Sequence, residues 1–204
     1  WCVVGSRNLQ QALDDLGADI QATVSWRPFQ LNPQIAAEGE NLTEHIMAKY
    51  GSSAADSQAM RDRLTQLGAS TGFRFNFSPE SRTYNTFDAH RVMHWAREQG
   101  CENAFMKALF DAYFTAGKNP SAPETLHAVA DSLGLDKAVI DDILASDQYR
   151  EEVTLELAQG QQMGITGVPT VIINDRYAIT GGQPPDVFKE ALLKIATEPS
   201  PDAP

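Results

Sequence analysis

The sequence predicts an α/β domain that is interrupted by a large all-helical insertion. Segments with strand periodicity occur near the two ends of the chain, whereas every periodic segment between about residues 42 and 161 has helical spacing. The two outer parts would therefore have to share one sheet. With 204 residues, 42% of them hydrophobic, the chain is long enough for a core domain that carries an insertion.

The first part, residues 1–41, is predicted to begin with a helix that leads into a strand. The buried face of this helix is marked by Leu9, Ala12, Leu13 and Leu16. Gly17 follows as a typical helix-ending residue. From Ile20 to Trp26 apolar and polar residues alternate, which predicts a half-buried strand that Pro28 stops. Because such a parallel unit needs a partner strand before the helix, we expect further residues upstream of Trp1.

The second part, residues 42–161, is predicted to be a helical insertion subdomain. Three apolar stripes at helical spacing support this: Ala89, Val92, Met93 and Ala96; Phe105, Ala108, Leu109 and Ala112; and Leu126, Val129, Ala130 and Leu133. Phe73, Phe75 and Phe77 stand at a period of two, which favours a short extended segment or loop that anchors the insertion. With Trp26 they could instead line a ligand groove, although Trp26 fits a core position better.

The third part, residues 162–197, returns to the α/β pattern. The apolar run Thr170–Ile173, the turn formers Asn174 and Asp175, and the segment Tyr177–Thr180 together predict a hairpin. A final amphipathic helix is marked by Phe188, Ala191, Leu192 and Ile195. The Pro-rich tail, residues 198–204, is predicted to be loose.

The charge of the chain limits its partners. It has 27 acidic and 16 basic side chains and a net charge of -11, so nucleic acid and anionic membrane surfaces would repel it. No apolar run approaches the roughly 20 residues that span a bilayer. The sequence leaves the oligomeric state open.

The two cysteines are too few for a disulfide scaffold or a zinc cluster. Cys2 lies at the predicted N-terminus of the first helix, where unpaired N–H groups and the helix dipole favour a thiolate. A redox pair needs a second sulfur within about one helical turn, and that partner would have to lie upstream of Cys2. A cysteine taken alone is more often buried or incidental than catalytic, and Cys101 is predicted to be a lone structural thiol.

Val168-Pro169 lies between Gly167 and the predicted strand that begins at Thr170. Only about 5–6% of X-Pro bonds are cis, so a proline at a strand start is normally just an edge residue. In a cis arrangement, however, the backbone of Val168 would point outward beside the helix end that carries Cys2. It could then pair with an extended peptide or a thiol ligand.

Several segments resemble a known family. Trp1-Cys2-Val3-Val4-Gly5 resembles the second half of a Cys-Pro-Trp-Cys motif, and Gly167-Val168-Pro169-Thr170 resembles the cis-proline loop of DsbA-like thioredoxin folds. The likeness continues through Phe29–Pro33, Asn85–His90 and Gly181–Pro185. Together these segments are similar to the FrnE-like branch, whose α/β fold is a thioredoxin domain with a large all-helical insertion.

The resemblance implies a thiol–disulfide oxidoreductase or isomerase. Cys2 would be the resolving cysteine, and the attacking cysteine would lie two positions before Trp1. Trp1 would flank the sulfurs, while Val168 and Pro169 would form the substrate-contacting loop. The redox-active cysteine pair would replace any metal, nucleotide or flavin cofactor, and glutathione could serve as a co-substrate. The partners would be thiols and disulfides of proteins or small molecules, in the cytoplasm.

Two alternatives stay open. The 2-hydroxychromene-2-carboxylate isomerases and the kappa-class glutathione transferases share the split fold, use Ser at the attacking position and bind glutathione. Their hairpin is usually followed by Asp-Arg, where this chain has Gln183-Pro184. With neither residue at the attacking position, the chain would be a non-catalytic peptide-binding module that uses the Val168-Pro169 loop. The residue two positions before Trp1 therefore separates the three hypotheses.

Asn85 and His90 are weaker candidates for residues that line a cleft. Asn85 would otherwise cap a helix, and His90 would otherwise pack or form hydrogen bonds near the junction of the subdomains. His90 and His94 stand four apart on a helix, a spacing that can hold a metal. The HExxH pattern of zinc proteases is absent there, so no metal site is predicted.

Overall fold

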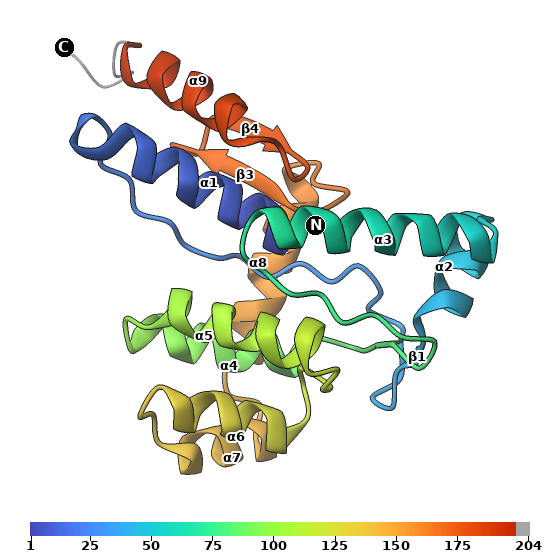
Figure 1. Ribbon diagram of the computed structural model, residues 1–204. Coiled ribbons are helices and arrows are strands. Elements are labelled where there is room, and N and C mark those ends of the chain that lie inside the picture. Colours follow the sequence, from blue (N-terminus) through green and yellow to red (C-terminus); the bar gives the residue numbers. More distant parts are fainter. Residues whose placement is uncertain (199–204) are drawn as a thin grey trace. The chain divides into compact units, whose positions relative to one another are not determined.

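The computed structural model describes residues 1–198 and divides the chain into two compact units (Figure 1). The first unit combines Trp1–Val24 with the chain from Thr166 onward, and the second comprises Ser25–Ile165. The expected split of an α/β domain by a helical insertion is therefore confirmed. Residues 199–204, most of the tail that we expect to be loose, lie outside the described residues.

The α/β unit contains two helices and a hairpin. Helix α1 spans Cys2–Leu16 and ends at Gly17, whose φ is 55°, and a short 3-10 turn, Gly17–Asp19, follows. Helix α9 spans Pro185–Ala196 and has a proline in its first turn, where the missing N–H costs nothing. The two helices lie side by side (Figure 1). Their core consists of Leu9, Ala12, Phe188 and Leu192, with Leu13, Leu16, Val24, Val171, Ile173 and Ile179 packed against it.

The predicted hairpin is confirmed to the residue. Strand β3, Thr170–Ile173, pairs antiparallel with β4, Tyr177–Thr180, and Ile173 stands opposite Tyr177. Asn174 and Asp175 adopt positive φ angles of 51° and 54°, which these two residue types tolerate better than most. The hairpin can be predicted because its turn chemistry and its alternation are both local in the sequence.

The strand that we expect over Ile20–Trp26 is wrong: these residues belong to no strand. Val24 packs on the core of the α/β unit, whereas Ala22 is exposed, so burial follows the apolar alternation only in part. At the end of the segment, the backbone N–H of Trp26 donates to the Glu102 carboxylate at 2.5 Å. Alternation reports half-burial, but a strand also needs a neighbouring backbone to pair with.

The helical unit begins earlier than expected, at Ser25 and not at residue 42. Polar contacts between distant segments hold residues 25–41 to this unit. The indole N–H of Trp26 donates to Asn103 Oδ1 at 2.8 Å, and Gln30 Nε2 donates to Asn85 Oδ1 at 3.0 Å. A two-residue ladder joins β1, Glu40–Asn41, to β2, Arg82–Thr83. Such contacts leave no periodic signal in the sequence.

Seven α-helices form the rest of the described helical unit: α2 (Leu42–Tyr50), α3 (Ala54–Ser70), α4 (Phe87–Glu98), α5 (Glu102–Phe110), α6 (Pro123–Ser132), α7 (Lys137–Ala145) and α8 (Arg150–Gln162). A π-helical turn, Asp111–Thr115, follows α5. The main core lies among α4 to α7 and consists of Ala89, Val92, Met93, Trp95, Ala96, Phe105, Leu109, Leu126, Val129, Ala130, Ile140 and Ile143. Among residues 1–198 there is no helix long and apolar enough to cross a membrane.

Candidate active site

Cys2 is the first residue of α1, and Trp1 is the residue that caps this helix. The first helical hydrogen bond runs from the N–H of Gly5 to the carbonyl of Trp1 at 2.9 Å. No side chain caps this helix end, and its first turn contains no acidic residue. The thiol of Cys2 is free and partly buried. Cys2 therefore stands at the positive end of a helix dipole.

Burial raises the pKa of the Cys2 thiol above its ordinary value, and hydrogen bonding to the helix backbone opposes this shift without overcoming it. The sequence argument from the helix end favours a thiolate, so the structure differs from that expectation. The physical reason is desolvation. Partial burial destabilises the thiolate more than the N-terminus of the helix stabilises it. Burial therefore disfavours the thiolate form of Cys2.

The loop before β3 lies next to the first turns of α1. The Val168-Pro169 peptide bond is cis, and both residues are partly buried. The carbonyl of Pro169 accepts a hydrogen bond from the N–H of Gly181 at 2.8 Å, and the hydroxyl of Thr170 donates to the carbonyl of Gly167 at 2.8 Å. Both sides of the loop are thus fixed by hydrogen bonds within the α/β unit.

The contact between helix and loop is made at Gly5. A Cβ placed on Gly5 would lie 2.9 Å from Cγ of Pro169, so the proline ring packs directly on the helix backbone. Cys2 and Gly5 are three residues apart and lie on neighbouring positions of one helical face. A Cβ on Gly182 would lie 3.3 Å from Cε3 of Trp1. The fold thus brings Trp1, the face of Cys2 and Pro169 together from opposite ends of the chain.

The sequence matches the model of the DSBA-like thioredoxin domain over residues 1–193, which is almost the whole chain. The chain belongs to the DsbA-like thioredoxin family. A crystal structure described as a probable DsbA oxidoreductase from Streptomyces coelicolor superimposes with a TM-score of 0.93. It is 30% identical in sequence, and the match covers 100% of this chain and 88% of that one.

Two further relatives are more distant. The protein YwbO of Bacillus subtilis (strain 168), which is described as uncharacterized, is 28% identical over 193 residues, covering 94% of this chain and 90% of YwbO. A 2-hydroxychromene-2-carboxylate isomerase superimposes with a TM-score of 0.68 at 17% identity, covering 95% of this chain and 91% of the isomerase. At that identity the likeness shows a shared fold alone. The DsbA-like thioredoxin fold with a helical insertion is therefore established for this chain.

Asn85 and His90 of this DsbA-like chain lie in the helical unit, where both are engaged in internal hydrogen bonds. Asn85 Oδ1 accepts from the N–H of Phe87, the first residue of α4, at 3.0 Å, and its Nδ2 donates to the carbonyl of Ile35 at 3.1 Å. Asn85 thus joins the start of α4 to the preceding loop. Nε2 of His90 lies 3.2 Å from the carbonyl oxygen of Phe29, and burial lowers the pKa of His90 to about 4.

The other residues considered from the sequence also have contacts within the helical unit. Nδ1 of His94 lies 3.2 Å from Glu156 Oε1, and Cys101 donates its thiol hydrogen to the carbonyl of Ala96 at 3.4 Å. In the part of the chain that the structure describes, no group of three or more His, Cys, Asp or Glu side chains is placed to hold a metal ion.

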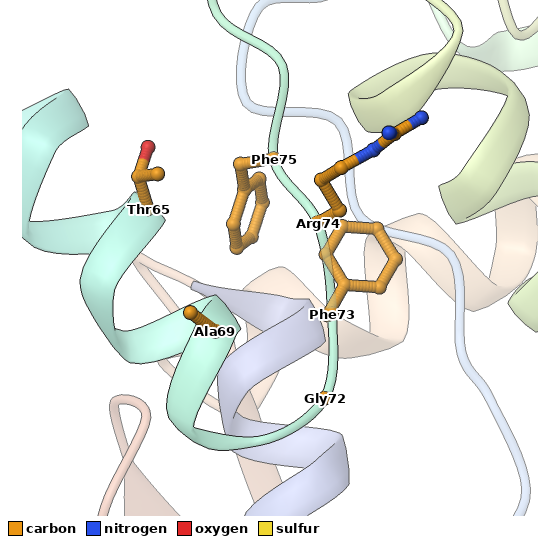
Figure 2. A pocket seen from close by; sticks show the side chains of 6 residues that line it. All are labelled: Thr65, Ala69, Gly72, Phe73, Arg74 and Phe75. Atoms are coloured by element: carbon orange, nitrogen blue, oxygen red, sulfur yellow. The ribbon is translucent and has the colours of Figure 1, made fainter.

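A small pocket of about 260 Å³ lies at the end of α3. Figure 2 shows Thr65 and Ala69 of α3 opposite the extended segment that carries Phe73 and Phe75. Phe73 and Phe75 are only 4% and 5% exposed, and their rings meet edge to face. The segment therefore anchors α3, as the period-two spacing of the phenylalanines suggests.

Three residues that shape the site receive no role from sequence reasoning: Asn8, and Gly5 and Gly182, which appear there only within segments that resemble the family. A glycine inside a helix weakens it, so Gly5 within a helical pattern is a signal for a close approach by another segment. Asn8 is 9% exposed although it is polar, and a buried amide needs a partner. The sequence alone does not show which distant segment supplies the approach or the partner.

Proposed function

We propose that this chain is a thiol–disulfide oxidoreductase in which Cys2 supplies the resolving sulfur. One observation carries the proposal: a free, partly buried thiol begins α1, on the helix face against which the ring of Pro169 packs. The likeness to the probable DsbA oxidoreductase of Streptomyces coelicolor supports the same chemistry. The attacking sulfur belongs to a cysteine two positions before Trp1, which completes a Cys-Pro-Trp-Cys motif.

In the reductive direction the exchange proceeds in two displacements. The thiolate of the attacking cysteine forms a bond to one sulfur of a substrate disulfide, the substrate S–S bond breaks, and the other substrate sulfur leaves as a thiolate. Cys2 then loses its proton and attacks the attacking cysteine's sulfur in the mixed disulfide. A disulfide forms within the motif, the second substrate thiol is released, and two electrons have passed to the substrate. The reverse sequence oxidises a dithiol.

The raised pKa of Cys2 suits the second displacement better than the first. A protonated, partly buried thiol reacts slowly with a disulfide that arrives from solution. In the mixed disulfide, by contrast, the reacting sulfur is already next to Cys2, and proximity offsets a small thiolate fraction.

The substrates of this reaction are thiols and disulfides of proteins or small molecules, with glutathione as a co-substrate where it serves as the reductant. The backbone at Val168 and the ring of Pro169 border the sulfurs and receive the substrate. The resemblance also implies a cytoplasmic location. Cell fractionation with an antibody against the chain would test that location.

The experiment uses the full-length protein with its native residues before Trp1. Dithiothreitol-dependent reduction of insulin disulfides is compared in the parent, a Cys2→Ser variant and a Cys101→Ser variant. We expect Cys2→Ser to lose turnover and to accumulate the mixed disulfide, because the resolving sulfur is absent. Cys101→Ser serves as the control and should retain activity.

Two outcomes would overturn the proposal. A cysteine at the upstream position without any dithiol-dependent exchange would show that the oxidoreductase function is wrong. A serine at that position would favour the glutathione-dependent isomerases and transferases that share the fold. In that case, glutathione binding measured by calorimetry should replace disulfide reduction as the observed activity.

A further inference from the structure

The turn that follows β4 holds the Pro169 loop in place. The N–H of Gly181 donates to the carbonyl of Pro169 at 2.8 Å, and the N–H of Gln183 donates to the carbonyl of Gly181 at 2.9 Å. Gly181 has a φ of 86°, a conformation that residues with a side chain rarely adopt. Any displacement of this turn would therefore be passed directly to the carbonyl of Pro169.

The same turn is also attached to the helix of Cys2. Nδ2 of Asn8, in α1, donates to the carbonyl of Gln183 at 2.8 Å. Gly182 packs against the start of the helix, because a Cβ placed on it would lie 3.4 Å from the carbonyl oxygen of Trp1 and 3.5 Å from the nitrogen of Gly5. The Gly181–Gln183 turn thus contacts both α1, which carries Cys2, and the Pro169 loop.

Asn8 continues a row of positions along one side of α1. Cys2, Gly5 and Asn8 are spaced three apart, so they follow one another along adjacent faces of the helix. Gly5 meets the ring of Pro169 and Asn8 meets the turn. The row therefore runs from the thiol, across the proline contact, to the amide that holds the turn.

We propose that Asn8 and the Gly181–Gln183 turn are positioning residues that set the separation between the Cys2 end of α1 and the Pro169 loop. The inference rests on the proposed function, since it concerns the same pair of segments. Asn8 acts through the turn and touches neither substrate nor sulfur. Its amide is needed because the carbonyl of Gln183 accepts from it in a region where Asn8 is only 9% exposed.

If the turn sets this separation, its position also sets how well Cys2 is shielded from water. Without the Asn8 amide, the turn can move away from α1 and take Pro169 with it through Gly181. Cys2 would then be better solvated, and its thiolate would form at lower pH. A loss of stability elsewhere in the core would not have this effect.

The test measures the rate at which iodoacetamide alkylates Cys2 as a function of pH, in a Cys101→Ser background. We expect Asn8→Leu to move the midpoint of the profile to lower pH by about half a unit, which raises the rate at neutral pH roughly threefold. Gly182→Ala would place a methyl group 3.3 Å from Cε3 of Trp1, slightly closer than an ordinary contact, so it should displace the turn a little and shift the profile in the same direction by a smaller amount. It also keeps the inference testable if Asn8→Leu does not fold.

Leu192→Ala is the matched control. Leu192 lies in the core of the same unit, is 8% exposed, and belongs to α9. Its truncation should lower thermal stability and leave the pH profile of Cys2 unchanged. The inference is refuted if Asn8→Leu and Gly182→Ala both fold and leave the profile unchanged, or if Leu192→Ala shifts the profile equally.

Insulin reduction by the full-length protein separates this inference from the proposed function. An altered alkylation profile in a protein that catalyses no exchange would refute the function and leave the positioning role intact. Normal exchange with an unaltered profile in both Asn8→Leu and Gly182→Ala would refute the positioning role alone. When both hold, the Asn8 variant should raise KM for the disulfide more than it lowers kcat, because the loop that receives the substrate has moved.

Discussion

The contact between Gly5 and Pro169 can be tested by adding one methyl group. In a Gly5→Ala variant the new Cβ would lie 2.9 Å from Cγ of Pro169 and 3.4 Å from Cα of Gly182. The first distance is about 0.6 Å below the ~3.5 Å at which carbon atoms pack comfortably. Neither neighbour is a flexible side-chain end, because one is a ring and the other is backbone. The helix start or the loop therefore has to move.

Two opposing effects determine the stability of this variant. Alanine stabilises a helix interior by about 1 kcal/mol relative to glycine. Overpacking a tight contact costs about 1–3 kcal/mol. We therefore expect the free energy of unfolding of Gly5→Ala to lie between unchanged and about 2 kcal/mol lower than that of the parent.

Gly160→Ala is the matched control for helix propensity. Gly160 lies in α8, about one turn from the end of its helix as Gly5 is in α1, and a Cβ placed on it meets nothing within 4 Å. This variant should be about 0.5–1 kcal/mol more stable than the parent. The difference between the two variants, measured by urea denaturation, isolates the packing term at about 1–3 kcal/mol. If Gly5→Ala is stabilised as much as Gly160→Ala, Pro169 does not press on α1 and the geometry of the site is wrong.

Three further variants test the helical unit. In Gly68→Ala the new Cβ would lie 2.5 Å from the ring of Phe75, which costs about 1–3 kcal/mol. Alanine returns about 1 kcal/mol in helix propensity, so the variant should lose up to about 2 kcal/mol in urea denaturation, and a net gain would contradict the packing of this segment on α3. His90 is neutral in the fold because burial lowers its pKa from 6.5 to about 4, whereas the unfolded chain binds a proton near pH 6.5. Stability should therefore fall by up to about 3 kcal/mol as the pH drops through that window, and His90→Gln should flatten this dependence in denaturation curves recorded across it. Arg91 is 1% exposed and donates to the carbonyls of Gln148 and Ser146. Arg91→Leu should therefore lower the free energy of unfolding by about 3 kcal/mol or more, as measured by thermal unfolding. A loss below about 1 kcal/mol would show that water replaces these hydrogen bonds.

The parts of the fold that could be predicted from the sequence are those with local causes. The hairpin β3–β4 follows from a run of β-branched residues and a turn of Asn174 and Asp175, and α9 follows from a single apolar stripe. The expected strand over Ile20–Trp26 is wrong because apolar alternation alone does not distinguish a ladder strand from an extended segment that belongs to no ladder. The start of the helical unit at Ser25 depends on polar contacts of Trp26 and Gln30 with distant residues.

The main residues of the candidate site could be predicted from the sequence, but the contacts that bring them together could not. The resemblance places Cys2 and Pro169 in one site, but the glycine that allows their segments to meet, and the amide that holds the turn, become visible only in the structure. The direction of the Cys2 pKa also differs from the sequence argument. Position at a helix end can be read from a sequence, whereas desolvation depends on what packs over the sulfur.

The raised pKa of Cys2 limits the chemical roles that this cysteine can have. A thiol that keeps its proton at neutral pH is a poor attacker of disulfides in solution, so Cys2 without a partner would leave the chain as a binding module. Under the proposed function a cysteine before Trp1 attacks first, and Cys2 acts only after the mixed disulfide has formed, when proximity offsets its small thiolate fraction. The burial that argues against Cys2 as an attacker thus suits it to resolve the intermediate. The proposed function therefore depends on the residue two positions before Trp1 more than on any further property of Cys2.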